Sequence, residues 1–420
     1  MAIIDTADVV IVGAGAAGLA AAVFCARGAS HPRRVICVDG AKTVGAKILV
    51  SGGSRCNVTN RTVTEHDFWG GDRRVVRDVL RAYPPARAIA FFEELGVTLR
   101  EEADGKCFPA SDRARTVLNA LVSAVSTSGA ELQTGCRVSS IHRDEEDAFV
   151  LTTTDGRTYR APLVVLATGG RSLPKTGSDG TGYAFARAFG HGYIDTTPAL
   201  VPLLLDDSCH ARLSGVAHPA AITVRSSGAS PVRLTGAMLW THFGVSGPVI
   251  LNASRHWLRS RLEGRDATSA LSVVPNETFT SIERWLTAEQ RHRPRALVRT
   301  VVAARVPAAV ADVWTERSGI AASTTLSHMT RDDRRRVIHA LLETPLHVRD
   351  SRGYNYAEVT AGGIPLTEID PATMESRLCR GLYLIGEMLD VDGRIGGFNF
   401  QWAWSSAWVA ASAIGRKLRD

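Results

Sequence analysis

Asp8-Val9-Val10-Ile11-Val12-Gly13-Ala14-Gly15-Ala16-Ala17-Gly18 decides the fold, because a short apolar strand runs directly into three spaced glycines and an alanine-rich helical segment. In this setting the first glycine makes a tight turn, the second lets the backbone approach a pyrophosphate, and the third allows close helix-strand packing. The N-terminus of the helix adds amide donors and a positive partial charge. We therefore expect a dinucleotide site at Gly13, Gly15, Ala16, Ala17 and Gly18. The alternative is a glycine-rich turn with only a packing role.

Asp39 supports the dinucleotide site. It stands 21 residues after Gly18, just past a second predicted strand at 34–38, and Gly40 follows it. A carboxylate in this position accepts hydrogen bonds from the ribose of the adenosine. Strand, glycines, helix and acid together are more specific than the glycine spacing alone.

The pattern along the chain predicts an α/β fold. Further strand signals lie at 132–141, 149–154 and 163–167. Helical patterns lie at 18–27, at 74–95 with an interruption at Pro84 and Pro85, and at 114–126. Such alternation is typical of a parallel sheet with helices on its faces. From about residue 198 short alternating segments predict a β-rich unit. Helical patterns at 279–290, 295–315 and 331–342 follow, with Pro294 and Pro307 as breaks or kinks. A strand at 381–385, a glycine-rich loop and a final helix end the pattern.

Two late segments indicate that the dinucleotide is FAD. The apolar strand at 163–167 ends in Thr168, Gly169 and Gly170, where backbone can lie close to a flat ligand. Gly386-Glu387 resembles the segment of two-dinucleotide flavoproteins whose acidic residue meets the ribityl chain of FAD. No second strand-GxGxxG-helix lies between them. Electrons must therefore come from substrate, from a nicotinamide that visits the flavin, or from another protein.

Length, composition and cysteine spacing exclude several other classes of protein. The 420 residues suggest two or three domains, and the mean hydropathy near zero is typical of a globular protein. The apolar stretch at 9–26 fits a strand-turn-helix, so we expect neither a signal peptide nor a membrane anchor, and a cytoplasmic location. The seven cysteines form no CxxC or metal-ligand spacing, so we expect no metal site and no flavin disulfide reductase.

The net charge of +7 and pI near 9.2 raise the question of an acidic partner. Only five of the 49 basic residues are lysine, a bias typical of a GC-rich genome. Arg334, Arg335 and Arg336 follow Asp332 and Asp333 in a helical pattern that fits a solvated face. We therefore expect a small-molecule substrate, with no nucleic acid and no membrane as partner. The oligomeric state stays open.

Several ordered blocks resemble a family of bacterial flavoproteins, the NAD(P)/FAD-dependent oxidoreductases that include aminoacetone oxidases and a dehydro bile-acid reductase. The resemblance runs nearly end to end. The blocks are Lys47-Ile48-Leu49-Val50-Ser51-Gly52-Gly53-Ser54-Arg55-Cys56-Asn57, Phe108-Pro109-Ala110-Ser111, Ala167 to Gly170 with Gly177-Ser178-Asp179-Gly180, Thr241-His242-Phe243-Gly244-Val245-Ser246-Gly247-Pro248, Thr360-Ala361-Gly362-Gly363, Gly386-Glu387-Met388-Leu389-Asp390-Val391-Asp392-Gly393 and Gly396-Gly397-Phe398-Asn399-Phe400-Gln401-Trp402-Ala403. Two positions depart from the family: Ser54 and Ala407-Trp408 stand where glycine is usual.

The resemblance implies a two-part Rossmann-like FAD-binding domain of the glutathione-reductase type, over 1–197 and 359–420. It also implies an inserted β-barrel-like domain at 198–251 and 344–358 and a helical subdomain at 252–343. Lys47, Ser51, Gly52 and Asn57 would lie around the pyrophosphate and ring, and the Val138 backbone near the adenine. The other residues implied to bind the cofactor are Arg55, Thr168, Gly169, Gly170, Gly386, Glu387, Asp390, Gly396, Gly397, Phe398 and Asn399.

Several single residues have more than one interpretation. Arg55 and Asn57 could hold their loop instead of touching flavin. Cys56 has no partner cysteine, which favours a packed thiol. Glu387, Asp390 and Asp392 could bind flavin hydroxyls, accept amide bonds at the last helix or act on substrate. Phe400, Trp404 and Trp408 share one helical face, where core packing is the favoured interpretation.

The expected chemistry is hydride transfer through flavin N5, with the protein supplying binding and orientation. We expect reduction of an activated C=C bond with diffusible NAD(P)H as donor. The alternatives are an amine-type oxidase that uses oxygen, a non-catalytic redox or electron-transfer flavoprotein, and a nucleic-acid-modifying flavoenzyme. Candidates for the proton-transferring group are His242, Tyr354 and Tyr356.

Overall fold

The computed structural model describes residues 4–27, 33–206 and 208–419. The chain divides into two compact units, Met1–Thr196 with Glu358–Asp420, and Thr197–Ala357. Each unit has its own apolar core. The second unit is therefore an insertion between the two segments that build the first.

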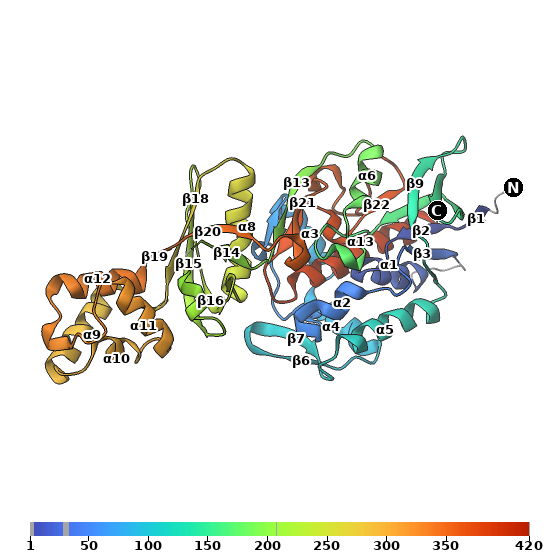
Figure 1. Cartoon of the computed structure of the whole chain (residues 1–420). Helices are drawn as coiled ribbons and strands as arrows, with labels where there is room; N and C mark the ends of the chain where they lie inside the picture. The colour runs from blue at the N-terminus through green and yellow to red at the C-terminus, as the bar shows by residue number, and fades with distance from the viewer. Residues whose placement is uncertain (1–3, 28–32, 207, 420) are drawn as a thin grey trace. The chain divides into compact units, whose positions relative to one another are not determined.

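The first unit is organised around a parallel five-stranded sheet with the order β22-β12-β2-β3-β8 (Figure 1). Its strands are β22 (Leu382–Leu384), β12 (Leu163–Leu166), β2 (Val9–Val12), β3 (Val35–Asp39) and β8 (Glu131–Thr134). Val9 is in register with Leu163 on one side and Val35 on the other. The buried Val, Ile and Leu runs explain a sheet covered on both faces. The α/β expectation with a parallel sheet is confirmed.

The described residues of this unit form the α-helices α1 (Ala16–Arg27), α2 (Ala46–Ser54), α3 (Arg73–Ala82), α4 (Pro85–Glu94), α5 (Ala114–Thr127), α6 (Thr181–Ala188) and α13 (Phe398–Lys417). Helix α1 packs against α13 and α5, so the two chain segments share one core. The predicted break at Pro84 and Pro85 separates α3 from α4. Pro85 starts α4, where its missing N–H costs nothing.

Smaller sheets flank the parallel one. A four-stranded sheet has the order β1 (Ile4–Thr6), β11 (Thr158–Ala161), β10 (Phe149–Thr153) and β9 (Val138–Arg143). A three-stranded sheet joins β4 (Thr59–Asn60), β7 (Lys106–Pro109) and β6 (Leu99–Glu101), and two-stranded pairs join β13 (Ile194–Ala199) to β21 (Val359–Gly363) and β23 (Val391–Gly393) to β5 (Phe68–Gly70). The single strand predicted at 132–141 is wrong. It is β8 and β9 in different sheets, because Gly135 turns the chain with φ of +70°.

The second unit contains a seven-stranded sheet with the order β19-β18-β15-β16-β17-β14-β20. Its strands are β14 (Leu203–Leu205), β15 (Ala217–Ser226), β16 (Val232–Thr241), β17 (Gly244–Ser246), β18 (Ala267–Ser272), β19 (Thr344–Leu346) and β20 (Val348–Ser351). The edge strands β19 and β20 are separated only by His347. The sheet must therefore curl until its two edges nearly meet, which makes it barrel-like.

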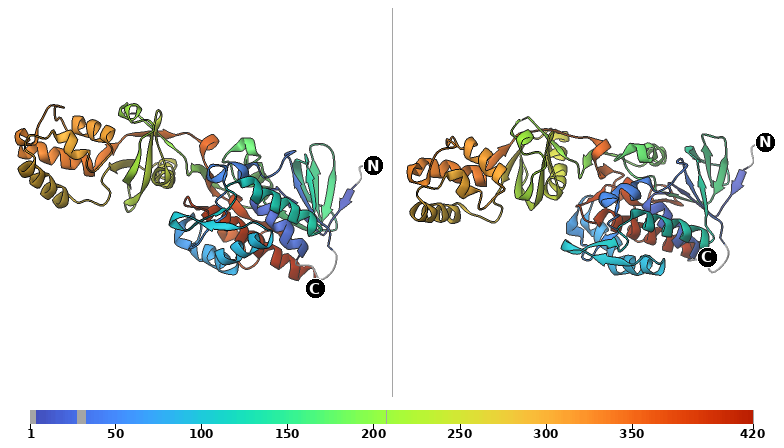
Figure 2. Two further views of the ribbon diagram at one scale, coloured as in Figure 1. Left: turned by 90° about the horizontal axis from the view of Figure 1, so that it is seen from below. Right: turned by 60° about the horizontal axis from the view of Figure 1, so that its bottom comes forward.

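Helices complete the second unit: α7 (Cys209–Arg212), α8 (Pro248–Leu262), α9 (Phe279–His292), α10 (Val298–Val302), α11 (Ala308–Arg317) and α12 (Arg331–Leu342). Within this unit α9 to α12 form one bundle next to β18 and β19 (Figures 1 and 2). The helical pattern at 295–315 is divided into α10 and α11 at Pro307, one of the two prolines expected to break or kink it, and Pro307 caps α11. Strand β18 also falls inside the range expected to be helical. No helix among the described residues is long and apolar enough to cross a bilayer.

Candidate functional site

The glycines of the first turn have different surroundings. A Cβ added at Gly13, where φ is +103°, would lie 2.6 Å from the Ala167 carbonyl oxygen, and one at Gly18 would lie 1.8 Å from the Gly13 oxygen. A Cβ at Gly15 would meet nothing within 4 Å. Two glycines therefore pack the turn against the end of β12, while the third leaves an open face at the start of α1. Ala16 and Ala17 form the first turn of that helix.

Asp39 fixes this turn through its carboxylate. Oδ2 accepts a hydrogen bond from the Ala14 amide at 2.7 Å, and Oδ1 accepts one from the Ala41 amide at 2.7 Å. Next to it, Gly40 has no room for a side chain, because a Cβ would lie 3.0 Å from the Cβ of Arg137. The ends of β2 and β3 are thereby held side by side.

The segment after Lys47 has an unusual backbone. Gly52, Gly53, Ser54 and Cys56 have φ of +55°, +67°, +66° and +62°, and Ser51 leaves helical geometry with ψ of 148°. Ser54, where the resemblance led us to expect glycine, is thus a non-glycine residue in the left-handed region. Such a conformation costs about 1–2 kcal/mol for an L-residue.

Arg55, Cys56 and Asn57 take different roles in this segment. Arg55 pairs with Glu102 at 2.8 Å and lies 4.0 Å from the Phe108 ring centre, which holds the loop to β6 and β7. Burial raises the pKa of the Cys56 thiol to about 12, in accord with a packed thiol. The Asn57 Oδ1 atom is buried and has no hydrogen-bond partner among the described residues. An amide oxygen without a partner in this place has capacity left for a ligand.

Lys47 and Glu387 meet across the unit. Lys47 Nζ donates to Glu387 Oε2 at 2.5 Å and also to Ser172 Oγ. Glu387 Oε1 accepts from Ser172 Oγ at 2.8 Å and from the Thr360 amide at 3.0 Å. Thr360 Oγ1 in turn accepts from the amides of Arg171 and Ser172. This network ties the segment after β12 to β21 and to the end of β22.

The segment after β12 is tightly packed. Gly169 has φ of +72°, and a Cβ at Gly170 would lie 2.4 Å from Thr360 Oγ1. Thr168 Oγ1 lies 4.0 Å from the Met388 sulfur. Val138 begins β9 and is buried. Thr168, Gly169 and Gly170 therefore place backbone, with little side chain, after the carboxyl end of β12.

The C-terminal glycines shape the start of α13. Gly396 and Gly397 have φ of +125° and +93°, and a Cβ at Gly397 would lie 2.5 Å from the Thr59 oxygen. Asn399 bonds Gly393 twice, as acceptor from its N–H at 2.7 Å and as donor to its carbonyl at 3.0 Å. Phe398 is fully buried against Phe68. The Asn399 and Phe398 side chains thus hold the loop, and the α13 N-terminus is left to offer amides.

The other predicted residues of this region have backbone contacts. The Gly386 amide donates to Ser406 Oγ at 3.1 Å, and the Gly386 carbonyl accepts from the Trp402 indole at 3.1 Å. Asp390 is buried, and its amide donates to the Ile364 carbonyl at 2.8 Å. Ser51 Oγ donates to the Ile48 carbonyl at 2.7 Å.

His242, Tyr354 and Tyr356 belong to the second unit, where Arg352 connects two of them. The Arg352 guanidinium lies 3.4 Å from the Tyr356 ring centre and 4.4 Å from that of Phe243, whose ring makes an edge contact with His242. His242 and Tyr356 are exposed. Tyr354 starts the turn η5 (Tyr354–Tyr356). The structure therefore places Arg352 against the rings of Phe243 and Tyr356, with His242 next to Phe243.

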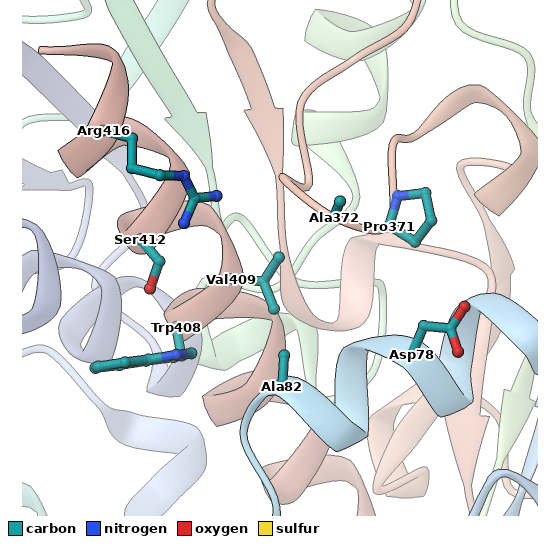
Figure 3. Close-up of a pocket in the computed structure, with 8 residues that line it drawn as sticks. All are labelled: Asp78, Ala82, Pro371, Ala372, Trp408, Val409, Ser412 and Arg416. Carbon is teal, nitrogen blue, oxygen red and sulfur yellow. The ribbon is translucent and has the colours of Figure 1, made fainter. Parts of the chain in front are cut away.

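A surface pocket of about 520 Å³ lies elsewhere on the first unit (Figure 3). Helix α13 contributes Trp408, Val409, Ser412 and Arg416, and the facing wall contains Asp78, Ala82, Pro371 and Ala372. Trp408 also stacks on Tyr83 at 5.3 Å, which fits core packing of this helical face. None of the predicted site residues lines this pocket.

Comparison with known proteins places the glycine turn in a family. The model of the family described as HI0933-like protein Rossmann domain matches residues 7–413. This chain belongs to that family. It is 31% identical over 407 residues to a 3-dehydro-bile acid delta(4,6)-reductase of Clostridium scindens, covering 97% of this chain and 98% of the relative. It is 32% identical over 411 residues to a ribosomal RNA dihydrouridine synthase of Escherichia coli, with the same coverage.

Solved structures share the fold at low identity. The Sdh1 protein of Mycobacterium smegmatis, solved in complex with UQ1, superposes with a TM-score of 0.50 and 14% identity, covering 99% of this chain and 69% of that chain. As a member of the HI0933-like family the chain is an FAD-dependent oxidoreductase, and the family and enzyme class expected from sequence are confirmed. No group of three or more His, Cys, Asp or Glu in the described parts of the chain is placed to hold a metal ion.

Sequence reasoning missed three residues of these clusters. Ser172 and Thr360 carry no motif that marks them, although Thr360 stands in a block that resembles the family. Arg352 was one of 49 basic residues. The two aromatic residues that it contacts, Phe243 and Tyr356, lie more than a hundred positions from each other along the chain. The only signal for Ser172 and Thr360 was the flanking glycine-rich sequence.

Proposed function

We propose that this protein reduces a C=C bond conjugated to a carbonyl group, with NAD(P)H as the electron donor. The observation that carries the proposal is the common chemistry of two relatives. The names 3-dehydro-bile acid delta(4,6)-reductase and dihydrouridine synthase denote different substrates, yet both products have lost a double bond conjugated to a carbonyl. Each relative covers nearly the whole chain.

The residues of the first unit fit FAD. The open face at Gly15 and the N-termini of α1 and α13 suit a pyrophosphate, and the orphan Asn57 Oδ1 suits an N–H donor of the ligand. We propose Lys47, Glu387 and the glycines at 169, 170, 396 and 397 as further contacts. FAD held by these residues would supply the hydride-transfer chemistry that connects a nicotinamide donor with the β-carbon of the substrate.

The protein has to bind the substrate carbonyl and supply a proton. Negative charge develops on the carbonyl oxygen as the hydride arrives, so hydrogen-bond donors or cations lower the barrier. His242, Tyr354 and Tyr356 are our candidates for the proton donor, and Arg352 joins them as a candidate for the carbonyl. Since no second glycine-rich dinucleotide turn is present in the sequence, the nicotinamide would approach the flavin from solution.

Anaerobic spectroscopy tests this proposal. The purified holoprotein is mixed with NADPH or NADH, and then with a 4,6-dien-3-one steroid acid or a uridine-containing RNA. We expect the flavin absorbance to disappear with the nicotinamide and to return with one of the acceptors. An amine that reduces the flavin, with oxygen as the only acceptor, would instead support an oxidase.

A second candidate is reduction of uridine within RNA, and the distribution of charge favours it. The second unit, residues 197–357, has 20 arginines and 13 acidic residues, whereas the first unit has 29 basic and 29 acidic residues. The whole excess of positive charge therefore belongs to the insertion. The total charge alone did not favour a polyanionic partner, but the concentration of that charge in the second unit does. Mass spectrometry of an rRNA transcript incubated with enzyme and NADPH tests it, because dihydrouridine has two more hydrogen atoms than uridine.

A further inference from the structure

The positive charge of the second unit is concentrated in its helical bundle. Residues 279–342 contain 11 arginines and six acidic residues. Helices α9 and α12 pack antiparallel: Phe279 lies 5.3 Å from the His339 ring at one end, and Arg334 Nη1 donates to Gln290 Oε1 at 3.1 Å at the other. The C-terminus of α9 therefore lies beside the N-terminus of α12.

Five arginines of these two helices and the loop after α9 are exposed and have no ion pair or hydrogen bond to any described residue. We call them the arginine face: Arg284, Arg291, Arg295, Arg331 and Arg335. Arg284 and Arg291 are seven apart on α9, and Arg331 and Arg335 are four apart on α12, so each pair shares one side of its helix. The loop of Arg295 is fixed to η4 (Leu326–His328) by the bond from the Ser327 amide to the Pro294 carbonyl.

Most acidic residues of the bundle are already used. Glu289 pairs with Arg293, Asp333 with Arg336, Asp312 with Arg299 and Glu316 with Arg212. Glu283 and Asp332 are the remaining carboxylates of α9 and α12. The arginine face therefore keeps an excess of positive charge after the pairs within the bundle have formed.

We propose that the arginine face is a docking surface for the phosphate backbone of RNA. This inference rests on the second candidate function, the reduction of uridine within RNA. Guanidinium groups bind phosphate through two parallel N–H donors, and an arginine without a carboxylate partner has all its donors available. Several phosphates bound at once would give affinity without sequence preference.

The surface fits RNA better than an acidic membrane. The exposed large hydrophobic side chains of the described residues are Ile4, Val50, Leu262, Tyr356 and Leu378, and none of them lies in the bundle. Peripheral membrane binding combines basic residues with apolar side chains that enter the lipid. The arginine face offers charge alone.

Fluorescence anisotropy with a fluorescein-labelled single-stranded RNA of defined sequence tests the proposal on the full holoprotein. The test variant is Arg291→Gln/Arg331→Gln/Arg335→Gln. The matched control is Arg73→Gln/Arg74→Gln/Arg81→Gln, which removes the same charge from exposed positions of α3 in the first unit. Circular dichroism and FAD content establish that both variants fold.

We expect the test variant to bind RNA about tenfold or more weakly at moderate salt, and the control to bind within about threefold of wild type. The slope of log K against log salt, which is negative, should become less negative by about 2 in the test variant, because each phosphate contact on a single strand contributes about −0.7. Equal binding of the two variants would overturn the proposal. So would binding to phosphatidylserine vesicles with none to RNA.

The outcome separates this proposal from the proposed function. RNA binding through the arginine face without formation of dihydrouridine would leave the docking surface and remove the second candidate function. Turnover of a steroid enone with no RNA binding would remove the docking surface and leave the conjugated C=C reductase.

Discussion

Lys47 Nζ lies 2.5 Å from Glu387 Oε2, and this ion pair joins residues 340 positions apart in the sequence. Both side chains are partly buried, with 26% and 18% of their surface exposed. The pair fixes the segment after β3 to the end of β22, next to Ser172 and Thr360. Local geometry of the proposed FAD site thus depends on one carboxylate that accepts three hydrogen bonds.

Replacing that carboxylate should weaken FAD binding. In Glu387→Gln the Lys47 ammonium loses its charged partner, and hydrogen bonds to charged groups contribute about 1.5–3 kcal/mol. We expect the Kd for FAD, measured by quenching of flavin fluorescence, to rise at least tenfold. Glu145→Gln, in the exposed turn between β9 and β10, is the matched control. An unchanged Kd in Glu387→Gln would contradict the role of this network.

Substitutions of two glycines in the first turn should separate an effect on FAD binding from an effect on stability. Gly15→Ala places a Cβ in open space, so the protein should fold normally and lose FAD. Gly18→Ala places a Cβ 1.8 Å from the Gly13 oxygen, so the helix must shift and stability should fall by about 1–3 kcal/mol or more. Urea unfolding and the FAD content of purified protein measure the two effects. The account fails if Gly15→Ala retains FAD or if Gly18→Ala is as stable as wild type.

Ser54→Gly should stabilise the protein. Ser54 has φ of +66°, and glycine adopts this conformation without the steric cost, so the free energy of unfolding should rise by about 1 kcal/mol. Ser123→Gly, at an exposed interior position of α5, should lower it by about 0.5 kcal/mol. Urea denaturation distinguishes the two signs. A loss of stability in both variants would argue against backbone strain at Ser54.

The second unit should lose stability in acid through His256 on α8. Burial, together with the smaller effect of the Arg255 charge, lowers the pKa of His256 to about 3. The folded unit keeps this imidazole neutral, while the unfolded chain takes up a proton below pH about 6.5. The free energy of unfolding should therefore fall by up to about 1.4 kcal/mol per pH unit between pH 6.5 and 3. Urea unfolding at several pH values should show a shallower dependence in His256→Gln and no change in His142→Gln.

The sequence predicted those elements of the fold that are determined by residues close together along the chain. The glycine spacing from Gly13 to Gly18 gave the turn because a tight turn and a close helix-strand contact each need glycine at a fixed offset. Pro84 and Pro85 gave the break between α3 and α4 for the same kind of reason. Strand β18 was missed because Ala267-Thr268-Ser269-Ala270-Leu271-Ser272 has weak strand propensity, and the pairing with β15 and β19 makes it a strand.

Contacts between distant segments could not be predicted. His191 is buried between Glu368 Oε2 and Ser376 Oγ, each at 2.8 Å, and its partners lie 177 and 185 positions away. Thr360 reaches the Ser172 amide across 188 positions. Nothing in the spacing of these residues marks them, because only the return of the chain after the inserted unit brings them together.

The most direct test of the proposed reaction is mass spectrometry of the acceptor after anaerobic incubation with the holoprotein and NADPH or NADH. The account predicts that a 4,6-dien-3-one steroid acid or a uridine in RNA gains two hydrogen atoms, and that Gly15→Ala abolishes this gain. If neither acceptor gains hydrogen while the flavin is reduced by an amine and reoxidised by oxygen, the conjugated C=C reductase is contradicted and the protein is an oxidase.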